Sequence, residues 1–144
     1  ERKLKDPEIG SNLGVDWAVL RLLRDDDKAS EVAHAAGERW SKFTSNVIQG
    51  LLPATEVMEG TDDLPRLEQQ CERSRRQLGP LYFAAGIDAL AEGDRVLAKQ
   101  YFRRAKDRGY ALFYDVQWSA AFLERLERDP TWPTWIPDKS SNRD

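Results

Sequence analysis

Residues 80–109 constrain the fold more than any other part of this chain, and they read PLYFAAGIDALAEGDRVLAKQYFRRAKDRG. Apolar residues recur every three or four positions on both sides of Glu92-Gly93-Asp94. This spacing is typical of two short amphipathic helices that are joined by a tight turn. We therefore predict helices over 80–92 and 94–108, with Gly109 at the end of the second helix.

Small and aromatic residues in this stretch follow a recognisable spacing. Gly86 and Ala98 are small side chains placed where two antiparallel helices need to cross closely. Together with their aromatic and small neighbours they form a pattern that resembles the tetratricopeptide repeat (TPR). The repeat-defining residues are Tyr82, Gly86, Gly93, Ala98, Phe102 and Ala105. The resemblance implies a scaffold that binds other proteins, and a generic helical hairpin is the alternative.

The remaining sequence predicts further helices and no β-strand. One helix runs from Leu13, where Asn12 can cap it, and Asp25-Asp26-Asp27 interrupts it. A second helix runs from Ala29 as far as Gly50, and the prolines and glycines of 53–63 then predict a turn. The last two predicted helices cover 64–78, stopped by Gly79-Pro80, and 111–128, stopped by Asp129-Pro130.

These elements predict an all-α fold of stacked antiparallel helical hairpins, a short TPR-like solenoid with a C-terminal closing helix. About 34 residues after Tyr82 and Gly86, one TPR period, stand Val116 and Ala120, so the closing helix resembles the start of another repeat. No such match occurs one period earlier. The expected organisation is a flexible arm, a single domain and a tail that contains Pro and Trp, over 1–12, 13–128 and 129–144.

The TPR resemblance also implies where a ligand binds. In TPR proteins the first helix of a repeat lines a concave groove, and the matching residues here are Phe83, Ala84, Ile87 and Ala91. These side chains are apolar, which favours a hydrophobic or helical segment of another protein as the ligand. The alternative is that they pack against the chain's own helices.

Basic residues recur every three or four positions along the second helix of the hairpin, at Arg95, Lys99, Arg103 and Lys106. They predict a basic face that attracts an acidic partner, or a face that is only solvated. Residues 1–72 carry 9 Lys or Arg and 15 Asp or Glu, and residues 73–144 carry 13 and 10. This asymmetry is too mild for a dedicated nucleic-acid binder, and we do not expect nucleic acid as a partner.

The tail contains two tryptophans, Trp132 and Trp135, within the sequence TWPTWIP. Large apolar side chains of this kind rarely stay exposed without a reason. They either fold back over Trp118 and Phe122 of the last helix, or they dock into a partner or a second copy.

The composition argues against catalysis. His34 and Cys71 are the only histidine and cysteine, and they lie on different predicted helices, so neither a catalytic triad nor a metal site is expected. No cofactor motif and no membrane span is visible. The lone cysteine and the lack of a secretory signal predict a cytoplasmic location. The chain begins at Glu1, and we expect it to be part of a longer protein.

Three functions fit this sequence. The first is a non-catalytic protein–protein interaction scaffold or regulatory domain of a larger protein. The second is a self-association module that uses the repeat edge or the tail. The third is a sensory or regulatory domain attached to a catalytic domain such as a kinase or cyclase.

Overall fold

The computed structural model describes residues 8–43, 49–61 and 63–139. Among these residues it contains seven helices and no strand, which confirms the predicted all-α class. The helices are α1 (Glu8–Leu22), α2 (Asp26–Trp40), α4 (Leu52–Met58), α5 (Leu64–Cys71), α6 (Arg75–Ala91), α7 (Arg95–Arg108) and α8 (Tyr114–Arg128). No helix in this part of the chain is long and apolar enough to cross a membrane.

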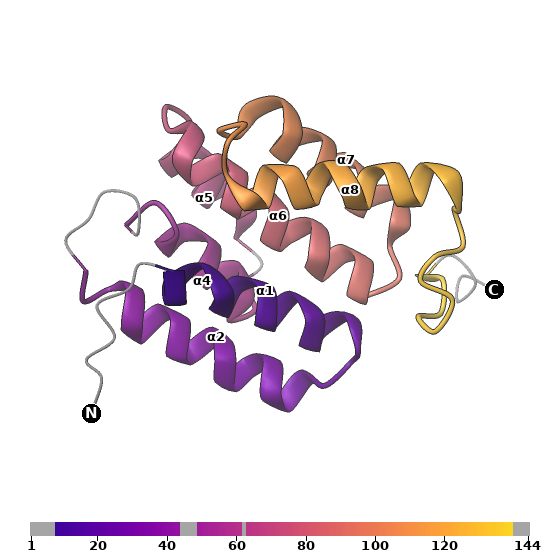
Figure 1. Cartoon of the computed structure of the whole chain (residues 1–144), viewed down its shortest axis with the longest axis horizontal. Coiled ribbons are helices and arrows are strands. Elements are labelled where there is room, and N and C mark those ends of the chain that lie inside the picture. Colours follow the sequence, from indigo (N-terminus) through magenta and orange to yellow (C-terminus); the bar gives the residue numbers. More distant parts are fainter. Residues whose placement is uncertain (1–7, 44–48, 62, 140–144) are drawn as a thin grey trace.

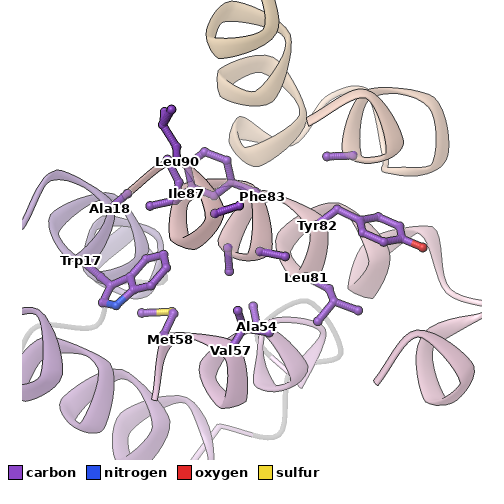
Figure 2. Close-up of a cluster of buried hydrophobic side chains, with 14 of the residues drawn as sticks. Trp17, Ala18, Ala54, Val57, Met58, Leu81, Tyr82, Phe83, Ile87 and Leu90 are labelled. Atoms are coloured by element: carbon purple, nitrogen blue, oxygen red, sulfur yellow. The ribbon is translucent and has the colours of Figure 1, made fainter. Parts of the chain in front are cut away.

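Helix α6 is the centre of the molecule. Figure 1 shows it between α1, α2 and α4 on one side and α7 and α8 on the other. Figure 2 shows Trp17 and Met58 on the first side and Phe83 pointing to the second. There the Phe83 ring packs on Phe102 of α7 and Phe122 of α8. Of the 17 residues of α6, 13 are buried, so its apolar surface is covered all round rather than along one stripe.

Helices α6 and α7 form the predicted hairpin, and glycine is needed at two of its positions. A Cβ atom at Gly86 would lie 2.5 Å from Cε1 of the Phe102 ring, so the two helices cross closely because this side chain is absent. Gly93 turns the chain between the helices with φ of +81°, in the left-handed region that favours glycine. Asp94 then caps α7 by accepting a hydrogen bond from the Leu97 backbone N–H at 3.0 Å.

The start of α6 differs from the prediction. A single helix over 64–78 was expected, but a turn at 72–74 divides it into α5 and the first turn of α6. Helix α6 then continues through Gly79-Pro80, where an end was predicted. Proline in a helix removes one backbone hydrogen bond, but burial of the surrounding side chains outweighs that cost here. Gly79 has a packing role, because a Cβ atom there would lie 2.3 Å from Oδ2 of Asp115 and 3.3 Å from Cγ2 of Val116.

The N-terminal half also differs in detail. Helix α1 begins at Glu8, before the expected Leu13, and α2 ends at Trp40 instead of continuing to Gly50. Pro53 does not end a helix but stands in the first turn of α4, where a proline costs no intrahelical hydrogen bond. The predicted turn over 53–63 is therefore largely helical. Part of the predicted second helix, residues 44–48, lies outside the described residues.

Candidate interaction surfaces

The four predicted groove residues lie in the core. Phe83, Ala84, Ile87 and Ala91 are 8%, 2%, 0% and 5% exposed. The chain's own helices α1, α4, α7 and α8 cover α6, so no open groove exists at these positions in the structure. This corresponds to the alternative in which the residues pack internally, so a partner surface has to be formed by other helices.

The six repeat-defining residues also lie inside the hairpin. Ala98, Phe102 and Ala105 of α7 are fully buried, and Tyr82 of α6 is 2% exposed. Tyr82 stacks on Tyr101 with ring centroids 6.4 Å apart. The role of these residues in the described structure is to join α6 to α7.

The predicted basic face does not form one surface. Arg95 is buried, whereas Lys106 is exposed and Lys99 is half-buried. Arg103 pairs with Glu127 of α8, at 3.3 Å between Nη2 and Oε1. A cleft of about 590 Å³ lies beside Arg95 and Lys99. Its lining also contains Asp94 and Asp138, so it has no strong preference for one sign of charge.

Arg95 instead holds the C-terminal segment against the domain. Its Nη2 donates hydrogen bonds to the carbonyl oxygens of Ile136 at 2.7 Å, Pro133 at 2.9 Å and Thr131 at 3.2 Å. Its Nε donates to the carbonyl oxygen of Trp132 at 3.1 Å. A guanidinium group presents several donors in a fixed plane, which suits this set of carbonyl acceptors. Sequence reasoning missed this role because the acceptors are backbone atoms, to which side-chain type gives no clue.

The tail folds back on the domain, as one of the two alternatives predicted. Trp132 packs on Phe122 with ring centroids 5.6 Å apart, and Ile136 is 2% exposed. The Trp135 indole N–H donates to the Leu22 carbonyl oxygen of α1 at 2.7 Å, which leaves the ring 52% exposed. Residues 129–139 of the tail do not cover Trp118, which stays 44% exposed.

Large apolar side chains are instead exposed on α8 and in the loop before it. Leu112 is 76% exposed, Tyr114 68% and Trp118 44%. Helix α8 packs on α7 and α6 through Val116, Ser119, Leu123 and Leu126, so its opposite side faces outward. We call the outward-facing residues Tyr114, Trp118, Ala121 and Arg125 the α8 face. Figure 1 shows α8 along the outer edge of the molecule, beyond α6.

One carboxylate of α8 lies against α6 with one of its two oxygens buried. Oδ2 of Asp115 is enclosed and has no hydrogen-bond partner among the described residues. A Cβ atom at Gly79 of α6 would lie 2.3 Å from this oxygen, so the carboxylate fits because Gly79 has no side chain. Burial raises the pKa of Asp115 to about 6, because the charged form loses its hydration.

The residues weighed for catalysis are not arranged as a reactive pair. Cys71 is buried, and burial raises the pKa of its thiol to about 11, which disfavours the nucleophilic thiolate. His34 lies at the surface, with Nε2 3.9 Å from Oε1 of Glu38 and Nδ1 3.7 Å from Oε1 of Glu59. Within the described ranges, no three His, Cys, Asp or Glu side chains come together in a way that could hold a metal ion.

Comparisons with protein-family models, with curated proteins and with solved structures gave no match for this chain.

Proposed function

We propose that this chain is a non-catalytic protein–protein interaction domain whose contact surface is the α8 face. The observation that carries the proposal is the exposure of Tyr114 and Trp118 on the side of α8 that no described helix covers. A soluble domain that exposes neighbouring large apolar side chains commonly uses them to bind another molecule. The residue types agree, since Trp, Tyr and Arg are enriched among the residues that dominate binding energy at interfaces.

The TPR resemblance supports the same location. Helices α6, α7 and α8 follow one another as antiparallel neighbours, and we propose that they form one repeat and the first helix of the next. In such an array each helix face is normally covered by the helix that follows. Helix α8 is the last helix in the described part of the chain, so its uncovered face is the place for a partner.

The proposal is tested by comparing partner capture by two matched variants. Trp118→Glu places a charge on the α8 face, and Val96→Glu places the same charge at a 65% exposed apolar residue of α7. Proteins cross-linked to wild type and to each variant are then quantified by mass spectrometry. We expect Trp118→Glu to lose partners that Val96→Glu retains. Equal capture by the three proteins would remove the α8 face as the contact surface.

A further inference from the structure

The α8 face has a regular order along the helix. Tyr114, Trp118, Ala121 and Arg125 are spaced by four, three and four residues, which places them in one line on the helix surface. The line lies opposite the buried residues that attach α8 to α6 and α7. Gln117, Glu124 and Arg128 are exposed beside it, and Glu124 pairs with Arg128. Polar side chains therefore flank this line on one side, and the partly buried Phe122, which packs on Trp118, lies on the other.

This order is complementary to itself when it is reversed. If a second α8 is laid antiparallel across the first, Tyr114 of each copy faces Arg125 of the other, and Trp118 faces Ala121. Both pairings are favourable. The large Trp118 packs over the small Ala121, and the Tyr114 ring meets the Arg125 guanidinium group. A two-fold symmetric dimer makes every such contact twice. From this complementarity we infer that the partner of the α8 face is a second copy of this chain, bound through antiparallel α8 helices.

Two of the larger side chains of this surface, Trp118 and Arg125, are already held in place. The Trp118 ring packs on Phe122 with centroids 6.2 Å apart. The Arg125 guanidinium lies 5.7 Å from the Trp132 ring centroid and 3.6 Å from the Asp129 carboxylate, and the side chain remains 54% exposed. Side chains that are ordered before binding lose less conformational entropy when an interface forms. A single helix pair is a small interface, so we expect a weak dimer that depends on protein concentration.

The test exchanges the large and the small residue across the symmetry axis. Trp118→Ala leaves a gap opposite Ala121, and Ala121→Trp brings two tryptophans into the same space. Both positions are exposed, so neither change disturbs the core, and circular dichroism checks the fold. Sedimentation velocity over roughly 1–500 μM then measures the mass of each protein, because weak dimers dissociate within this range. The monomer is 16.5 kDa.

We expect wild type to approach twice the monomer mass and each single variant to weaken dimerisation at least about tenfold, which corresponds to 1.4 kcal/mol. An equimolar mixture of the two variants should dimerise again, because each contact then joins one large and one small side chain. The double variant Trp118→Ala/Ala121→Trp should also dimerise, for the same reason. Rescue by mixing is specific to this antiparallel register, since a general apolar patch does not predict it.

This inference rests on the proposed function, but the two fail separately. A wild-type monomer throughout the concentration range, or single variants that dimerise like wild type, would overturn the inference. A wild-type dimer that the variants weaken and the mixture does not restore would also overturn it, because the register would be wrong. In each case the capture comparison between Trp118→Glu and Val96→Glu still decides whether the α8 face binds a different protein.

Discussion

Helices α6 and α8 both carry aromatic and small apolar residues, but their surroundings differ. Burial covers 13 of the 17 residues of α6, whereas only four of the 15 residues of α8 are buried. The resemblance to a repeat marked α6 as the binding helix, and yet α6 is the helix that the rest of the chain covers. The availability of a helix face therefore depends on which neighbours the chain supplies, and a local motif does not show this.

The largest expected difference between the two helices is in the stability cost of losing an aromatic ring. Phe83→Ala in α6 removes a buried side chain that packs on Phe102 and Phe122, and it should cost about 3–5 kcal/mol of unfolding free energy. Trp118→Ala in α8 should cost less than about 1 kcal/mol, because the ring is 44% exposed. Urea unfolding monitored by circular dichroism measures both, at a concentration low enough to keep the chain monomeric. Similar losses of unfolding free energy in the two variants would contradict the difference between the covered α6 and the open α8.

Local patterns predicted the two C-terminal helices well for a physical reason. Gly93 and Asp94 give the turn and the cap of α7, and Asp129-Pro130 marks the end of α8, so these boundaries depend on residues close in sequence. The division between α5 and α6 was missed because Leu67, Cys71 and Leu78 keep helical spacing across the turn. Nothing in that spacing distinguishes one helix from two that pack on the same core.

The candidate site was less predictable than the fold. Phe83 and Ile87 have the composition of a groove, but other helices cover α6 on both sides. Helices α1 and α4 come from residues more than twenty positions earlier, and α7 and α8 place Phe102 and Phe122 against Phe83. Arg95 was part of the predicted basic face, but its side chain donates hydrogen bonds to carbonyl oxygens some forty residues later in the chain. Both errors have the same origin, since long-range packing decides exposure. In the sequence, Trp118 stood out only as a residue over which the tail would fold.

The second-largest expected loss of stability concerns the close crossing of α6 and α7. Gly86→Ala places a Cβ atom 2.5 Å and 2.7 Å from two carbons of the buried Phe102 ring. Because Phe83 and Phe122 pack on this ring, it cannot move aside freely, and we expect a loss of about 3 kcal/mol. Thermal unfolding measures the change.

Gly14→Ala in α1 is the matched control for that substitution. Its new Cβ atom would meet Cη2 of Trp40 at 3.8 Å, which is an ordinary contact. Alanine is the better helix former, so this variant should gain roughly 0.5–1 kcal/mol. If both variants change stability in the same direction, the close crossing at Gly86 is not what requires glycine there.

The third prediction concerns the buried contact between α8 and α6. The pKa of Asp115 is raised to about 6 by burial, above the value near 4 of an exposed aspartate. Between these two values the folded state binds more protons than the unfolded state, so the contribution of Asp115 makes stability fall as pH rises from about 4 to 6 and then stay constant. Asp115→Asn removes this penalty. It should stabilise the fold by about 2–3 kcal/mol at pH 7, with little gain near pH 4.

Unfolding measured at several pH values tests the Asp115 prediction, and the informative quantity is the difference between variant and wild type. Other groups titrate in the same range, but they are common to both proteins and cancel in the difference. Asp107→Asn on α7 is an exposed control that should leave stability unchanged at every pH within about 0.5 kcal/mol. A difference at Asp115 that does not vary with pH would show that the carboxylate is not desolvated by its contact with Gly79.

The smallest expected effect concerns the segment that covers one end of the α6–α7 hairpin. Arg95→Met keeps an apolar stem of similar length but removes the donors that hold the carbonyl oxygens of Thr131, Pro133 and Ile136. We expect a loss of about 2 kcal/mol of unfolding free energy and a red shift of tryptophan emission, because Trp132 leaves its contact with Phe122.

Lys99→Met, one turn along α7, is the matched control for Arg95→Met. Lys99 is half-buried and forms no ion pair with a described residue, so this variant should leave both quantities nearly unchanged. The described part of the tail touches the α8 face through Trp132, which lies beside Arg125. Arg95→Met should therefore weaken dimerisation much less than Trp118→Ala does. If releasing the tail instead abolishes dimerisation, then Trp132 and Trp135 belong to the interface, and the contrast between a covered α6 and an open α8 extends to the tail.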